Sequence, residues 1–269
     1  MKRIPAILCI VVLAVALIAG DAQGRPLYVS LTFDDGLASQ WHERAVLDDL
    51  GVAATFYVNS GKVGRSGFMT WSQLAELQAD GHEIGGHTVD HVDLQTRTAA
   101  EQQQQVCDDR RTLQANGLSV AMFAFPFGRL DAALRDVVRA CGYASARTTG
   151  GLDVPPDCCL YANPIPPLNA WDVRAWQVRL TTPIEEYRAV IELGRDGGGG
   201  WIPIVFHDIC TGACAGWSSY AVRRDLLEQL IRWIQADPDL RLATVGRVMA
   251  IAADATAPVV ALTAPADGA

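Results

Sequence analysis

The stretch "LYVSLTFDDG", residues 27–36, shows a pattern that recurs along the chain. An apolar, partly alternating run typical of a buried strand ends in two carboxylates and a glycine. Similar runs lie at 53–58, 83–87, 122–127, 143–148 and 201–207. Helix-like segments separate them, at 39–50, 70–80, 98–116, 130–141, 184–194 and 219–236. Strands and helices in regular alternation predict an α/β protein, with a parallel sheet that is either open or closed into a barrel.

The composition indicates a globular protein and excludes some classes of partner. Half of the 269 residues are hydrophobic and 19% are charged, so the chain can bury a sizeable core. The formal net charge is -8, and the basic residues are scattered. Nucleic acids and anionic membranes bind clustered Lys and Arg, so neither is expected as a partner.

The two ends of the chain differ from its middle. A cationic start, an apolar run from Ile4 to Ala19 and small residues up to Gly24 are the parts of a secretory signal. A retained membrane anchor is the alternative, although the run is shorter than the roughly 20 residues of a spanning helix. After Asp254 the chain is rich in Ala, Pro, Val and Thr. We expect a signal peptide over 1–24, one domain over 25–253, and over 254–269 a linker that begins a truncated Ig-like segment.

The cysteines indicate disulfides. One of the seven, Cys9, lies in the apolar N-terminal run. The other six are Cys107, Cys141, Cys158, Cys159, Cys210 and Cys214. An even number in an exported protein indicates three disulfides, and the spacings do not fit a zinc knuckle. We expect the first two to pair with each other and to join successive helices, and the middle two to pair with the last two between loops.

Unusual polar residues follow the strand-like runs, where parallel α/β proteins collect their functional groups. These residues are Asp34, Asp35, His87, His91 and His207. If a helix follows the strand, two histidines four positions apart share one face and can bind one cation, with an aspartate as third ligand. Two nitrogens, one oxygen and open positions for water are typical of a catalytic metal site. Exposed or core histidines with backbone partners are the alternative.

The adjacent aspartates also allow two interpretations. The dipeptide Asp35-Gly36 can simply close a strand as a turn. Two carboxylates side by side after an apolar strand, however, repel each other unless a cation or hydrogen bonds compensate. With a metal present, one aspartate binds it and the other can act as general base on a metal-bound water.

The motifs "TFDDG", "HTVDH", "FAFPFG" and "VFHD" occur in the order and strand positions of the polysaccharide deacetylase family. That family includes chitin, peptidoglycan and acetylxylan deacetylases, and the chain resembles it from Pro26 to Met249. The resemblance implies a distorted (β/α) barrel of about seven parallel strands and a divalent metal, usually Zn2+. The domain over 25–253 is then the catalytic domain.

Residue by residue, the resemblance implies Asp34 as general base and His207 as general acid. It implies three metal ligands: Asp35, His87 and His91. A metal-bound water would attack the acetyl carbonyl, and the metal and a backbone N–H near Phe127 would stabilise the oxyanion.

The chain departs from the family pattern at two places. The third motif usually has an arginine that orients the catalytic carboxylate, and this chain has Ala124 there. Arg147, at the end of "YASART", is a candidate for the supporting cation from an adjacent strand, and a surface arginine in a loop is the alternative. The motif that usually gives the acid histidine an acidic partner is not recognisable, and Asp172 is the candidate for that partner.

The residues and the resemblance together predict a secreted, metal-dependent hydrolase that removes acetyl groups from an N- or O-acetylated polysaccharide or oligosaccharide. We expect a monomer, extracellular or associated with the cell wall, without a membrane span after signal cleavage. A non-catalytic carbohydrate-binding relic, suggested by Ala124, and an amidase for small amides are the alternatives. The presence of a base, three ligands and an acid favours the enzyme.

Overall fold

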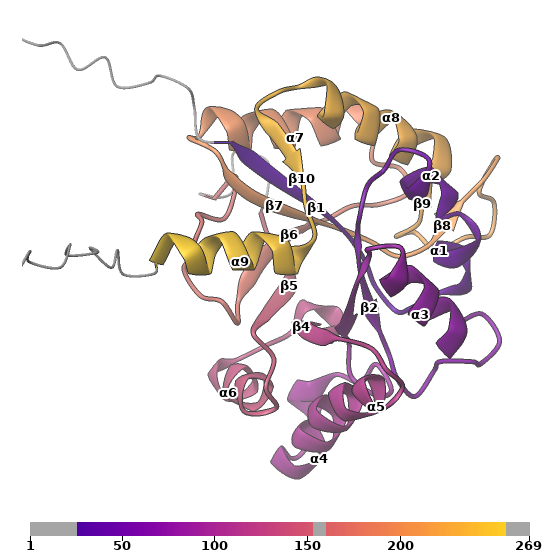
Figure 1. Ribbon diagram of the computed structural model, residues 1–269, viewed down its shortest axis with the longest axis vertical. Helices are drawn as coiled ribbons and strands as arrows, with labels where there is room; N and C mark the ends of the chain where they lie inside the picture. Colours follow the sequence, from indigo (N-terminus) through magenta and orange to yellow (C-terminus); the bar gives the residue numbers. More distant parts are fainter. Residues whose placement is uncertain (1–25, 153–159, 257–269) are drawn as a thin grey trace, which may run out of the picture.

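The computed structural model describes residues 26–152 and 160–256, and a parallel barrel forms their core (Figure 1). Its strands are β1 (Leu27–Phe33), β2 (Thr55–Val58), β3 (Glu83–Gly86), β4 (Val120–Ala124), β5 (Ser145–Gly151), β6 (Val173–Gln177) and β7 (Gly200–Phe206). They are neighbours in chain order, and β7 pairs back with β1 from Leu27↔Gly200 to Phe33↔Phe206. The short β10 (Leu240–Leu242) adds to the start of β1. The expected parallel barrel is therefore confirmed.

Helices in the connections between strands surround the barrel. They are α1 (Ala38–His42), α2 (Ala45–Asp48), α3 (Trp71–Ala79), α4 (Ala99–Gln103), the π-helix η2 (Gln104–Asp108), α5 (Asp109–Ala115), α6 (Ala132–Ala140), α7 (Ile184–Asp196) and α8 (Arg224–Ala236). Short 3-10 turns are η1 (Leu94–Thr96) and η3 (Pro126–Gly128). The helix expected at 219–236 begins later, because β9 (Val222–Arg223) pairs there with β8 (Ile209–Cys210).

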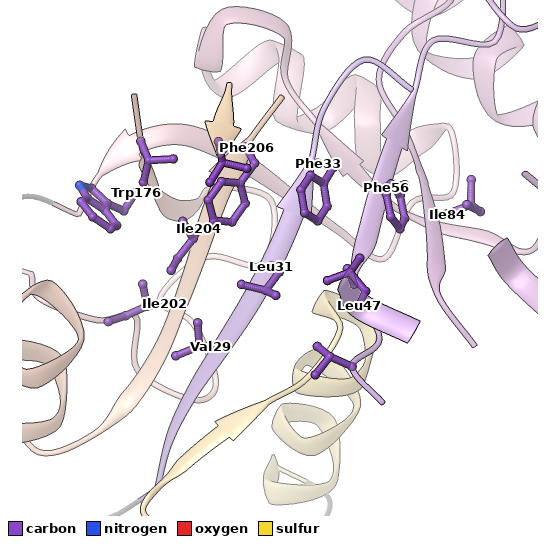
Figure 2. Packing of buried hydrophobic residues seen from close by; sticks show 14 of the residues in the cluster. Val29, Leu31, Phe33, Leu47, Phe56, Ile84, Trp176, Ile202, Ile204 and Phe206 are labelled. Carbon is purple, nitrogen blue, oxygen red and sulfur yellow. The ribbon is translucent and has the colours of Figure 1, made fainter. Parts of the chain in front are cut away.

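Alternation along β1 divides the core into two parts. Val29, Leu31 and Phe33 point toward the surrounding helices together with apolar side chains of β2 and β7 (Figure 2). The Phe33 ring stacks on Phe56 and Phe206, with ring centroids 5.2 and 5.3 Å apart. Each such side chain, when buried, contributes about 1.5–3 kcal/mol to folding. This outer layer holds the helices on the barrel.

The second part of the core fills the inside of the barrel. Its buried side chains are Tyr57, Met122, Ala124, Val173, Trp201, Val245 and Val248. The last two belong to α9 (Val245–Thr256), whose first turn binds Thr55 and Glu83 at the starts of β2 and β3. Helix α9, which the sequence did not predict, therefore covers the amino ends of these strands, and it continues past the expected domain boundary at 253.

One disulfide prediction is confirmed and another is wrong. Cys107 in η2 pairs with Cys141 at the end of α6, as expected. Cys210 pairs with Cys214 across one short loop, with Cα atoms 5.6 Å apart. They therefore do not pair with Cys158 and Cys159, because a local turn already brings the two sulfurs together.

Several expectations concern residues outside the described ranges. These are the signal peptide over 1–24, Cys158 and Cys159, and the tail from 257 onward. Within residues 26–152 and 160–256, no helix combines the length and the apolar character needed to cross a membrane.

Candidate active site

The carboxyl ends of neighbouring strands bring the expected polar residues together. Asp34 and Asp35 follow β1, and His87 follows β3. His207 follows β7, which pairs with β1, and the N–H of Asp34 donates to the carbonyl of Phe206 at 2.9 Å. The side chain of Gln40 in α1 donates to the carbonyls of Asp34 and His207, which ties the two strand ends together.

Three of the expected ligands converge. Oδ1 of Asp35 lies 3.6 Å from Nε2 of His87 and 3.3 Å from Nε2 of His91, and the three potential ligand atoms lie within 4.8 Å of one another. The expected helix after His87 is absent from this segment. Instead, Asp35, Thr88 and His91 have left-handed backbone conformations, with φ of 75°, 68° and 59°. Such strained residues are typical of functional sites, and these turns bring the two histidines together.

The donor set fits a divalent cation. Nδ1 of His87 donates to the carbonyl of Ala124 at 2.7 Å, so its Nε2 presents a lone pair to Asp35. Oδ1 of Asp35 is buried and has no hydrogen-bond partner in the part of the chain that the structure describes. Burial lowers the pKa of His87, and burial, together with the nearby His87, lowers that of His91 to about 4. Neutral imidazoles facing an unpaired carboxylate oxygen are ready to bind a metal.

Asp34 lies beside this cluster in a buried ion pair with Arg147. Burial raises the pKa of Asp34 but the charge of Arg147 lowers it, and the balance holds this pKa below its ordinary value. The Arg147 guanidinium also lies over the ring of Tyr57, 4.5 Å from its centroid. The alternative of a surface arginine is therefore wrong. Because Arg147 on β5 is the register partner of Ala124 on β4, the guanidinium enters the barrel beside that alanine.

The two oxygens of Asp34 have different surroundings. Oδ1 accepts the hydrogen bond from Arg147, whereas Oδ2 lies 3.9 Å from Nε2 of His87. One oxygen is therefore held by a cation while the other faces the ligand cluster. This arrangement orients the carboxylate toward the site.

His207 and Phe127 border the same cluster. The His207 ring packs on Tyr220 with centroids 5.3 Å apart, and among the described residues its buried Nδ1 has no hydrogen-bond partner. Asp172 does not supply one, because it pairs with Arg135 at 3.0 Å, and that expectation was wrong. Phe127 is 56% exposed, the centroid of its ring lies 4.7 Å from that of His91, and its backbone is left-handed at φ 59°.

Sequence reasoning missed two residues that bind the main chain of His87 and Thr88. Asn59, after β2, donates to the carbonyls of His87 and Thr88. Asp109 at the start of α5 accepts from the N–H of His87 at 3.0 Å. Both act on main-chain atoms, and Asp109 lies in the polar run "CDDRR", so neither leaves a recognisable spacing in the sequence.

Comparison with known proteins matches parts of this chain to polysaccharide and chitin deacetylases. The model of the family described as polysaccharide deacetylase matches residues 21–146. A chitooligosaccharide deacetylase from Azorhizobium caulinodans is 30% identical over 119 residues, which are 42% of this chain and 54% of that protein. A chitin deacetylase from Pestalotiopsis sp is 41% identical over 76 residues, 28% of this chain and 25% of that one. The chain spans about half or less of the length of the curated relatives that it matches.

The likeness of fold extends over more of the chain than the sequence match. A solved structure from Mycobacterium smegmatis, assigned as a polysaccharide deacetylase, covers 91% of this chain and 96% of its own with a TM-score of 0.63. At 17% identity, this likeness concerns the fold alone. The matched residues 21–146 include the aspartate pair and both histidines of the cluster, whereas Arg147 and His207 lie beyond them. The barrel, the convergent strand ends and the matched segment agree, and residues 21–146 of the chain match the polysaccharide deacetylase family.

Proposed function

We propose that this chain is a secreted, metal-dependent hydrolase that removes acetyl groups from an N- or O-acetylated polysaccharide or oligosaccharide. The observation that carries the proposal is the unpaired, buried Oδ1 of Asp35, which faces the Nε2 atoms of His87 and His91. The names of the relatives, chitin deacetylase and chitooligosaccharide deacetylase, support an N-acetylated sugar polymer as the first substrate to test.

In this proposal, Asp35, His87 and His91 hold one divalent cation. Two imidazole nitrogens and one carboxylate oxygen are donors that Zn2+ accepts in catalytic sites, with positions left for water and substrate. When bound, such a cation supplies Lewis-acid polarisation of water or of a carbonyl. The hydrogen bond from Nδ1 of His87 to Ala124 fixes the tautomer that leaves Nε2 free.

Asp34 would act as the general base. Arg147 holds Oδ1, so the carboxylate is ionised at neutral pH and presents Oδ2 toward the ligand cluster. Oδ2 can take the proton of an attacking water, provided that substrate binding brings this water within hydrogen-bond distance.

His207 would act as the general acid from the neighbouring strand end, after β7. When the acetyl C–N or C–O bond breaks, the leaving nitrogen or oxygen needs a proton, and the imidazolium of His207 can donate it. Asp34 gains one proton and His207 loses one, so the two groups exchange protonation states in one turnover. A backbone N–H near Phe127 would stabilise the negative charge on the carbonyl oxygen.

The proposed location is outside the cell or at the cell wall, and the partner is the glycan alone, with the chain as a monomer. The signal-like composition of residues 1–24 supports export. The disulfides Cys107–Cys141 and Cys210–Cys214 support it too, because such bonds persist in oxidising compartments.

Metal content and acetate release test the proposal together. The mature chain should bind one Zn2+ and release acetate from at least one of chitooligosaccharides, acetylxylan and peptidoglycan. His87→Ala and His91→Ala should each lose most of the metal and of the activity. Asp34→Asn and His207→Ala should keep the metal and lose turnover, because neither residue is a ligand.

The outcomes separate the competing functions. Full metal occupancy in a double His87→Ala, His91→Ala variant would contradict the ligand set. Metal binding and glycan binding without acetate release would favour the carbohydrate-binding relic. Hydrolysis of small amides but not of the polymers would favour the amidase.

A further inference from the structure

A buried carboxylate behind the ligand cluster joins the ends of two strands. Oδ1 of Asp109 accepts from the N–H of Ser60 after β2 at 2.9 Å, and Oδ2 accepts from the N–H of His87 after β3 at 3.0 Å. The hydroxyl of Tyr143 donates to the same Oδ2 at 3.4 Å. Asp109 is fully buried. The His87 N–H is shared with the carbonyl of Val58 at the end of β2, at 3.0 Å, so Asp109 adds a side-chain link to this strand contact.

The space around this contact is filled. A Cβ atom at Gly86, next to His87, would lie 2.0 Å from the hydroxyl oxygen of Tyr143 and 2.6 Å from Oδ2 of Asp109. Distances this short are incompatible with any side chain, so the strand end accommodates only glycine there. The carboxylate and the phenol thus pack directly against the backbone that presents His87.

A disulfide holds together the two segments that supply these groups. Cys107 lies two residues before Asp109, and its partner Cys141 lies two residues before Tyr143. Arg110 adds to the same connection, since its guanidinium donates to the carbonyls of Val120 and Cys141. The π-helix η2 ends directly before Asp109, and such segments are frequent at functional sites.

We propose that Asp109 is a positioning residue for the metal site and that the Cys107–Cys141 disulfide keeps it in place. This inference rests on the proposed function, in which His87 is a metal ligand. The imidazole of His87 is held on its far side by Ala124, and its main chain is held by Asp109. Without the contact to Asp109, the main chain of His87 keeps only its bonds to Val58 and Asn59, and Nε2 is held less firmly relative to Asp35 and His91.

The size of the effect follows from how metal sites respond to their supporting hydrogen bonds. Loss of such a partner costs about 10–100-fold in metal affinity. In Asp109→Asn the side chain keeps its shape, but its NH2 group then faces one of the two backbone N–H donors. We expect the Kd for Zn2+ to rise about 10–100-fold in this variant.

The test measures metal affinity and ligand geometry, both independent of turnover. The Kd for Zn2+ is measured by competition with a chromophoric chelator, and the absorption spectrum of the Co2+ form reports the coordination. Asp108→Asn is the matched control, because Asp108 is the neighbouring, exposed carboxylate and pairs only with Arg111 among the contacts described for it. Far-UV circular dichroism of the metal-free variants reports folding.

The disulfide provides a second arm that remains informative if Asp109→Asn fails to fold. The variant with Cys107→Ser and Cys141→Ser should also raise the Kd, by less than Asp109→Asn, since the carboxylate is still present. The variant with Cys210→Ser and Cys214→Ser is its control and should keep the wild-type Kd.

The outcomes distinguish this inference from the proposed function. An unchanged Kd and Co2+ spectrum in folded Asp109→Asn would overturn the positioning role, while wild-type metal binding and acetate release would leave the proposed function intact. An unchanged Kd in the Cys107→Ser, Cys141→Ser variant would overturn the role of the disulfide. A wild-type chain that binds no metal would overturn both the inference and the proposed function.

Discussion

Replacing Arg147 with Met should destabilise the protein strongly, because it leaves the Asp34 carboxylate unpaired inside the barrel. The two side chains are 0% and 1% exposed, so water does not compensate the lost partner. Methionine keeps an unbranched apolar stem inside the barrel and removes the guanidinium, which lies over the Tyr57 ring. The variant therefore removes the guanidinium together with its contacts to Asp34 and Tyr57.

Breaking a buried ion pair from one side costs about 3–5 kcal/mol in the free energy of unfolding. For a domain of this size each kcal/mol lowers Tm by about 2–4 °C, so Tm should fall by about 6–20 °C at neutral pH. The loss should shrink on acidification. In the wild type Arg147 lowers the pKa of Asp34, and its stabilising effect is lost as the pH falls through that pKa. In the variant burial raises the pKa, so protonation of Asp34 relieves the penalty.

Two control variants make this test specific. Arg135→Met breaks the ion pair with Asp172, whose side chains are 30% and 33% exposed, and should cost at most about 1 kcal/mol. The double variant Arg147→Met, Asp34→Asn removes both buried charges and should be more stable than Arg147→Met alone. Urea unfolding of the metal-free proteins measures all four free energies. The reasoning is refuted if Arg147→Met costs no more than Arg135→Met, or if the double variant gains nothing.

Further predictions concern His91 and the barrel interior. In the metal-free protein burial lowers the pKa of His91 to about 4, whereas an ordinary histidine titrates near 6.5. NMR should therefore show a neutral His91 ring at about pH 5.5 to 6. Between about pH 6.5 and 4 the unfolded chain binds a proton at His91 that the folded chain does not, so the stability should decrease as the pH is lowered through this range. A His91 titration near 6.5 would contradict this. Gly85→Ala should cost about 1–3 kcal/mol, because its Cβ would lie 2.5 Å from the Tyr57 ring. Gly150→Ala, which meets nothing within 4 Å, should change stability by at most about 0.5 kcal/mol in chemical denaturation; equal costs would refute the packing argument.

The sequence predicted the elements whose signal is local. The run at 27–33 coincides with β1. Both sides of this strand are buried, and the run itself is almost continuously apolar, so the strand was visible from its own residues. Strand β6 was missed, since "VRAWQ" places an exposed arginine between buried residues and pairs through its neighbours β5 and β7. Helix α9 was missed as well, because its capping partners Thr55 and Glu83 are remote in sequence.

The sequence predicted that Asp35, His87 and His91 come together, but it did not predict the geometry of this cluster. The spacing of His87 and His91 indicated a shared cation and suggested a helix, yet the two side chains meet through left-handed turns at Thr88 and His91. Asn59 and Asp109 contact main-chain atoms of His87 and Thr88, where this segment begins. Main-chain groups are the same at every position, so such contacts leave no pattern that a reader of the sequence can recognise.

The positions of Ala124 and Arg147 show how a departure from a motif can still leave an arginine beside Asp34. Register partners on adjacent parallel strands point to the same side of the sheet and lie about 4.8 Å apart. Ala124 is buried inside the barrel, so its partner Arg147 also points inward, and its long side chain reaches Asp34. An arginine at 147 and a small residue at 124 can therefore deliver a guanidinium to the same carboxylate. Because the inward direction of Arg147 depends on the β4–β5 register, the sequence alone named the candidate and could not decide between a supporting cation and a surface residue.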